Sequence, residues 1–249
     1  MKKTIVLLHG LRGTHHGLSA IADALTEKGY ETITPDLPGS GEEKDIANKN
    51  LDAYAEWLHK MITKLPHKPY IVGHSMGSIV VSHYLEKYPD DVQRKVVFMS
   101  PIFRTKTGQL TSNILYALSS GALHLVPRKP RYNFMRSKAV SFCISHYLTA
   151  DKSQQKQIDE LHYKYSGRFV SADSLLKDMK ISMREQTVFP ANKDALYIMG
   201  NKDRLTKVKL ARKRVAEKGA DFTELDATGH LINYEKPEQV ADAIAEFLA

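Results

Sequence analysis

Cysteine is nearly absent from this chain of 249 residues. Its single cysteine, Cys143, excludes an internal disulfide framework and is typical of a protein from a reducing compartment. We expect Cys143 to be a small, buried apolar residue of a helix. Long hydrophobic runs are also missing, since none approaches the roughly 18 apolar residues of a membrane-spanning helix, and the run at 5–8 is too short for a signal peptide. A cytoplasmic location is therefore the expectation.

Acidic residues are missing from one part of the sequence. No Asp or Glu stands between Val92 and Ala150, and residues 101–190 carry 14 Lys or Arg against six acids. That excess accounts for the whole net charge of +8, so the remainder of the chain is neutral. A segment whose charge differs so clearly from its surroundings predicts an inserted unit.

Patterns typical of strands and helices alternate outside this basic segment. Several runs rich in Val, Ile and Leu are apolar at every position, as expected for strands of a parallel sheet covered by helices on both faces. The alternation predicts an α/β fold with a mostly parallel, doubly wound sheet. The predicted strands are 3–9, 30–35, 69–74, 95–100, 195–200 and 221–227, and the predicted helices are about 16–28, 50–64, 76–88, 206–218 and 237–248.

The basic segment itself has the pattern of several short helices without strand runs. Strand patterns stop near Ser100 and resume near Ala195. We therefore expect a core made of residues 1–100 and 191–249, interrupted by a helical lid at 101–190.

A serine stands at the junction of a predicted strand and a predicted helix, in the sequence Gly73-His74-Ser75-Met76-Gly77. G-x-S-x-G in this context is typical of a nucleophile elbow, whereas the same five residues alone could form an ordinary turn. The tight turn strains the backbone at Ser75 and requires small residues two positions away, which Gly73 and Gly77 supply. At the start of the helix, the amide of Met76 would face a developing oxyanion.

With this elbow the sequence resembles the α/β-hydrolase superfamily, in its lid-bearing serine esterase and lipase branch. Further segments match the family pattern in the expected order, namely "LLHGLRG", "PDLPGSG", "IMGNKDRL" and "ATGHLINYEKPEQV". The resemblance extends over essentially the whole chain, and it implies the α/β-hydrolase fold with an inserted helical lid.

The resemblance also implies a set of catalytic roles. Ser75 would be the nucleophile, His230 the base that takes its proton, and Asp203 the acid that orients the histidine. The order Ser, Asp, His along the chain is the one that this fold uses. Backbone amides of Leu11 and Met76 would form the oxyanion hole.

Among the reactions of the family, the residues favour hydrolysis of carboxylic esters with small or medium acyl chains through an acyl-enzyme. Dehalogenases and epoxide hydrolases of the family use Asp at the position of Ser75, and carbon-carbon hydrolases usually have Trp where Leu231 stands. Two alternatives stay open. One is a carbon-carbon bond or thioester hydrolase acting on an anionic metabolite, and the other is a protein of this fold that binds a ligand without turning it over.

The basic segment leaves the partners open. It fits a solvated surface, a site for an anionic substrate group, or peripheral contact with an anionic membrane. A nucleic acid is not expected, because no nucleic-acid-binding module is present, and neither a metal nor a cofactor is expected from the spacing of His, Cys and acids. Nothing indicates the oligomeric state. Our candidates for substrate binding are Arg128, Arg131, Tyr116 and Phe134.

Overall fold

A six-stranded sheet forms the centre of the protein in the computed structural model, which describes residues 2–184, 194–217 and 219–249. The strand order is β2-β1-β3-β4-β5-β6, and every neighbouring pair is parallel. All six predicted strands are confirmed. They are β1 (Thr4–Leu8), β2 (Glu31–Ile33), β3 (Tyr70–His74), β4 (Val96–Met99), β5 (Ala195–Gly200) and β6 (Asp221–Leu225).

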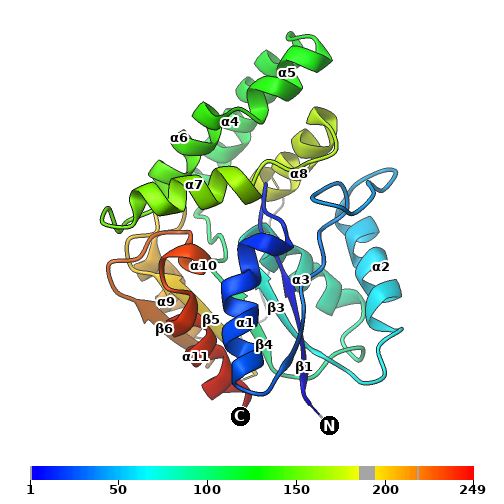
Figure 1. The fold of residues 1–249 in the computed structure, drawn as a ribbon, viewed down its shortest axis with the longest axis vertical. Coiled ribbons are helices and arrows are strands. Elements are labelled where there is room, and N and C mark those ends of the chain that lie inside the picture. The colour runs from blue at the N-terminus through cyan, green and yellow to red at the C-terminus, as the bar shows by residue number, and fades with distance from the viewer. Residues whose placement is uncertain (1, 185–193, 218) are drawn as a thin grey trace.

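Helices cover both faces of this sheet (Figure 1). In β1, Ile5 and Leu7 pack on one face with α1 (Ser19–Glu27) and α11 (Pro237–Leu248). Val6 and Leu8 alternate with them and point to the other face, as the period of a strand requires. That second face is covered by α2 (Leu51–Ile62), α3 (Met76–Lys87) and α9 (Val208–Ala216). The predicted doubly wound α/β fold and its five helices are thus confirmed, with η1 (His15–Leu18) and α10 (Ile232–Glu235) as additional short elements.

Five helices of the described residues lie between β4 and β5 in the sequence, and Figure 1 shows them gathered at one end of the sheet. We call them the helical segment. α4 has 19 residues and is longer than the short helices that the sequence predicted. The last residues of the predicted lid, 185–190, and the first residues of the second part of the predicted core, 191–193, lie outside the described residues. The helices are α4 (Lys106–His124), α5 (Arg128–Met135), α6 (Lys138–Leu148), α7 (Gln155–Tyr165) and α8 (Ala172–Arg184).

A buried polar cluster ties α8 to the core. The Lys49 ammonium group, which has no exposed surface, lies 3.0 Å from the Asp178 carboxylate and donates to Ser174 Oγ at 2.7 Å. The hydroxyl of Tyr54, in α2, donates to the other Asp178 oxygen at 2.7 Å. Burial raises the pKa of Asp178 to about 6. The helical segment is therefore held to the core by specific polar contacts as well as by apolar packing.

Helices that span a membrane need roughly 18 or more consecutive, mostly apolar residues. Within the described ranges, no helix combines enough length with enough apolar character to cross a membrane.

Candidate active site

Ser75 stands in a strained turn between β3 and α3. Its φ of 52° and ψ of −115° lie outside the conformations that side-chain-bearing residues normally adopt. The two flanking glycines allow this turn to pack directly against neighbouring backbone. A Cβ added at Gly73 would lie 2.7 Å from the backbone of Ser78, and one added at Gly77 would lie 2.5 Å from the carbonyl oxygen of Leu8. The predicted elbow geometry is present, and it aims the serine toward the end of the sheet that carries the helical segment.

Ser75, His230 and Asp203 lie in one hydrogen-bonded line, and all three are buried. His230 Nε2 is 2.9 Å from Ser75 Oγ, and His230 Nδ1 is 2.8 Å from Asp203 Oδ2. Because a carboxylate accepts only, Nδ1 carries the proton and Nε2 is free to accept one from the serine. Such a line can move a proton from Ser75 to His230.

The second carboxylate oxygen of Asp203 is also occupied, since the amides of Leu205 and Thr206 donate to it at 2.7 and 3.2 Å. Burial by itself raises the pKa of Asp203, but the charge of His230 and these hydrogen bonds outweigh it and leave the pKa below its ordinary value. Asp203 is therefore held as a carboxylate facing His230.

The loop after β1 passes directly against Ser75. A Cβ added at Gly10 would lie 2.9 Å from Cβ of the serine. No described residue accepts a hydrogen bond from the next amide, that of Leu11, or from the amide of Met76. Two uncommitted donors therefore flank the serine, as an oxyanion hole requires.

His9 holds this loop in place through two hydrogen bonds. Its Nδ1 donates to the carbonyl of Gly10 at 2.9 Å, and its Nε2 accepts from the amide of Leu37 at 2.9 Å. Burial lowers the pKa of His9 to about 4. The ring is thus neutral near pH 7, which matches its one donating and one accepting nitrogen.

The loop that carries His230 is anchored by the helical segment. The amide of His230 donates to the carbonyl of Leu148, the last residue of α6, at 2.8 Å. Buried Glu235 accepts three backbone hydrogen bonds at 2.9 Å, from Gly229 on one carboxylate oxygen and from Ala150 and Asp151 on the other. Sequence reasoning missed Glu235, because an acid at the end of a short helix carries no sign of such distant partners.

A cavity of about 1120 Å³ extends from Ser75 and His230 into the space between the core and the helical segment. Its walls come from the loop after β1, from α4 and α6, and from the segment after Asp203. Cys143, predicted to be buried, is exposed and lines this cavity, because α6 turns that side chain toward the open space rather than toward α7. Many lining side chains are apolar, among them Leu11, Leu18, Ile102, Phe103, Ile144, Leu148, Val208, Leu210 and Leu231.

Positive charge also lines the cavity. Arg12, which follows the proposed oxyanion residue, has a φ of 64° and donates through Nη1 to the carbonyl of Met135 at 2.8 Å. Its Nε and Nη2 are buried and have no hydrogen-bond partner among the described residues, and burial lowers its pKa to about 10. Sequence reasoning missed this residue, although a cation inside "HGLRG" was a visible signal. Asp203 is the one carboxylate among the described lining residues, and the cations are Arg12, Arg104, Arg204, Lys207 and Lys209.

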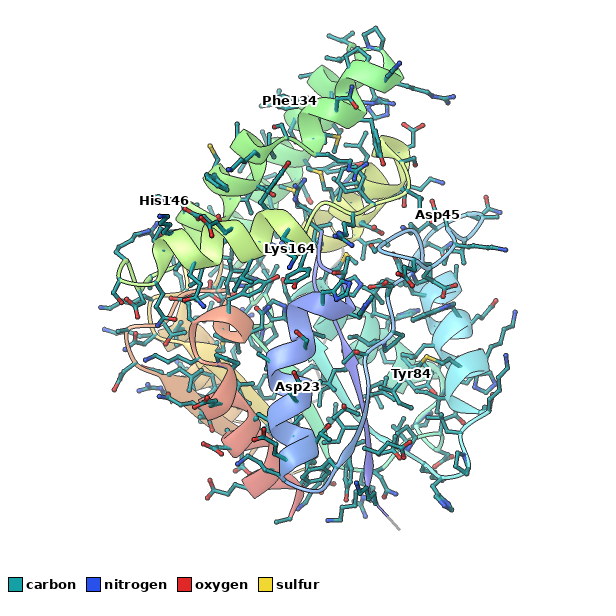
Figure 2. The ribbon with its side chains drawn as sticks, in the orientation of Figure 1. Asp23, Asp45, Tyr84, Phe134, His146 and Lys164 are labelled. Atoms are coloured by element: carbon teal, nitrogen blue, oxygen red, sulfur yellow. The ribbon has the colours of Figure 1, made fainter. Side chains whose placement is uncertain are left out.

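The structure does not bring the four predicted substrate-binding residues to this cavity. The guanidinium group of Arg131 is buried and lies 2.6 Å from the carboxylate of Asp173, which also pairs with Arg128 at 3.4 Å. Tyr116 faces α8, with its hydroxyl 3.5 Å from the carbonyl of Leu176. Figure 2 shows Phe134 near the end of the helical segment that is farthest from the sheet, and it is exposed. These side chains serve the packing and the outer surface of the segment.

Comparison with known proteins gives one matching family model, described as the alpha/beta hydrolase family, over residues 5–243. The sn-1-specific diacylglycerol lipase ABHD11 of Mus musculus is 25% identical over 98% of this chain and 80% of its own length. A thermophilic esterase from Thermogutta terrifontis, solved with malate bound, is similar with a TM-score of 0.76 and 18% identity over 100% of this chain and 90% of that one. A bromoperoxidase from Bacillus anthracis has a TM-score of 0.73 and 18% identity over 100% and 92% of the two chains. Proteins of different activities thus share this fold.

Proposed function

Because the chain belongs to the alpha/beta hydrolase family, as the match over residues 5–243 shows, we propose that it is a serine hydrolase whose triad is Ser75, His230 and Asp203. Its substrates are carboxylic esters with small or medium acyl chains, cleaved through an acyl-enzyme. The observation that carries the proposal is the unbroken line of hydrogen bonds from Ser75 Oγ through both ring nitrogens of His230 to the Asp203 carboxylate. An apolar cavity beside that line offers room for an acyl chain.

The reaction follows from the positions of the protons. Ser75 Oγ attacks the ester carbonyl carbon while His230 Nε2 takes the hydroxyl proton, and the negative oxygen is stabilised by the amides of Leu11 and Met76. When the tetrahedral intermediate collapses, the bond to the leaving alcohol breaks and His230 returns the proton to it. A water molecule then attacks the acyl-enzyme with His230 as base, which frees the carboxylic acid and regenerates Ser75.

In this proposal the helical segment is the predicted lid. Side chains of α4 and α6 line the cavity opposite Ser75, so this segment decides which acyl chains fit. Arg128 and Arg131, the example residues for binding an anionic metabolite in the carbon-carbon or thioester alternative, do not support it, because both are paired with Asp173 away from the cavity.

Hydrolysis of p-nitrophenyl esters of graded chain length tests the proposal. Ser75→Ala is expected to reduce kcat on the order of 10⁶-fold, while Ser153→Ala, an exposed serine outside the cavity, keeps the wild-type rate. A fluorophosphonate should label the wild-type protein and fail to label Ser75→Ala. Undiminished turnover by Ser75→Ala removes this residue from the mechanism, and a wild-type protein that neither reacts with the probe nor cleaves any ester is the binding protein instead.

A further inference from the structure

Apolar side chains at the wall of the cavity are exposed to solvent. Leu115 of α4, Tyr147 of α6 and Leu205 after Asp203 all line the cavity, and their exposed fractions are 54, 51 and 40%. Large apolar side chains that combine these two properties stand at the rim, where the cavity meets the surface. Part of the entrance to the proposed active site is therefore apolar.

The exposed apolar surface continues from this rim along α4. Leu110, Ile114 and Leu118 recur every four residues, so they form one stripe on the helix, directly beside Leu115. Their exposed fractions are 60, 51 and 68%. Monomeric proteins rarely expose contiguous apolar surface of this kind unless it contacts a partner.

The opposite side of α4 contacts α8, which places the stripe on the outside. Gln109 Nε2 donates to the carbonyls of Met183 and Arg184 in α8 at 3.0 and 3.1 Å. Ser112 Oγ donates to the carbonyl of Met183 at 2.8 Å. The helix is thus held in place by α8, and the stripe does not depend on a further partner for its position.

Exposed cations border the apolar surface. Lys106 stands one helical turn before Leu110, and Arg204, Lys207 and Lys209 flank Leu205 and line the cavity. None of the four forms an ion pair with a carboxylate in the ranges 2–184, 194–217 and 219–249. Residues 92–150, which include α4 and α6, contain no acid at all. This combination of an apolar patch and unpaired cations is complementary to a surface that is negative outside and apolar beneath.

We propose that the face formed by the α4 stripe, the apolar rim and these cations docks on an anionic lipid bilayer. The leucines and Ile114 enter the boundary between headgroups and acyl chains, and the cations contact the lipid phosphates. A second copy of the chain is a poorer occupant, because two such faces would bring like charges together. Docking in this orientation opens the cavity toward the acyl chains. The inference goes beyond the proposed hydrolysis, since binding to the bilayer does not require Ser75.

Co-sedimentation with vesicles tests the proposal independently of catalysis when it is performed with the Ser75→Ala protein. Binding to vesicles of phosphatidylcholine and phosphatidylglycerol is expected, with weak binding to phosphatidylcholine alone and loss of binding at high salt. The double variant Ile114→Ser/Leu118→Ser should lower the affinity at least about tenfold, because two apolar side chains no longer enter the bilayer. Lys106→Gln should lower it about fivefold on anionic vesicles and leave binding to neutral ones unchanged.

Val170→Ser is the matched control, because Val170 is exposed to a similar fraction, 46%, and lies outside the stripe. It should bind like the parent protein. On a soluble short-chain ester the Ile114/Leu118 variant, made with Ser75 intact, should keep the wild-type rate, since neither residue lines the cavity. The proposal is overturned if anionic vesicles do not retain the protein, if the double variant binds as well as the parent, or if light scattering shows a dimer that the double variant abolishes.

Discussion

The amide of His230 donates a hydrogen bond of 2.8 Å to the carbonyl of Leu148, so the loop of the proposed base is held by the last residue of α6. The approach is close, because a Cβ added at the preceding Gly229 would collide with the same carbonyl oxygen. Parts of the chain that are 82 residues apart by the printed numbering thus meet at the proposed catalytic base. The helical segment consequently does two things, since it lines the cavity and positions His230.

Glu235→Gln is expected to loosen this anchor. The carboxylate accepts backbone hydrogen bonds on both oxygens, whereas the amide of Gln offers one oxygen and turns an NH₂ group toward a backbone N–H. We expect a loss of about 1–3 kcal/mol in the free energy of unfolding. Because His230 follows Gly229 directly, kcat on a p-nitrophenyl ester should fall more than KM changes. Urea unfolding and steady-state kinetics measure the two effects.

Glu238→Gln provides the control for this experiment, because Glu238 is an exposed acid of the neighbouring helix. It should leave kcat unchanged and cost less than about 1 kcal/mol in the free energy of unfolding, the usual contribution of an exposed acid in the first turn of a helix. If Glu235→Gln loses stability but keeps kcat and its pH profile, Glu235 holds the fold together without positioning His230.

Asp203→Asn is expected to keep the shape of the triad while removing the carboxylate that orients His230. The Asn side chain has almost the same shape, but its NH₂ group or its neutral oxygen no longer fixes the proton on His230 Nδ1. We expect kcat to fall about 10⁴-fold while KM and the thermal midpoint change little. A decrease of less than tenfold would show that another group orients His230. Asp226→Asn is a suitable comparison, because Asp226 is exposed and bonds Asn201 outside the triad.

Local patterns predicted the sheet and the tight turn at Ser75, for a physical reason, whereas His230 and Asp203 were implied only by the resemblance to a family. A strand buried on both faces must be apolar at every position, and a tight elbow must have glycines at fixed distances, so both leave marks within a few consecutive residues. The strands from Thr4–Leu8 to Asp221–Leu225 and the turn at Ser75 belong to this class.

Features that depend on distant partners could not be predicted in the same way. Glu235 bonds amides that lie 84 and 85 residues away, and nothing near it in the sequence marks them. The surrounding positive charge predicts that Arg131 binds substrate, but Asp173, 42 residues later, pairs with it. The density of charge along a sequence does not reveal which cations the fold neutralises.

The stability of the protein is expected to fall as the pH decreases from 6.5 to 4, with His9 as one cause. Its pKa is lowered to about 4 by burial, whereas an unfolded histidine titrates near 6.5. Between these values the unfolded chain binds more protons than the folded one, so the free energy of unfolding rises with pH and is lost on acidification. The contribution of His9 is about 3 kcal/mol over this window. Urea unfolding at several pH values measures it.

His9→Gln should flatten this pH dependence relative to the wild-type protein, although it also removes the acceptor for the amide of Leu37. The test therefore compares how the free energy of unfolding changes with pH in the two proteins, not its value at one pH. His124→Gln is the matched control, because His124 is exposed on α4. Equal slopes for His9→Gln and the wild-type protein would mean that folding does not change the pKa of His9.

Gly77→Ala is expected to disrupt the elbow itself. The added methyl group would lie 2.5 Å from the carbonyl oxygen of Leu8 and 2.6 Å from that of His9, and both are backbone atoms of a buried strand end that cannot swing away. We expect a loss of about 3 kcal/mol in the free energy of unfolding, the upper end of the usual cost of overpacking, together with loss of labelling by a fluorophosphonate. Gly121→Ala, in α4, meets no atom within 4 Å and should instead add up to about 1 kcal/mol through helix propensity. A Gly77→Ala protein as stable and reactive as the wild type would show that the turn can widen, and that Ser75 does not depend on this close packing of β1 against α3.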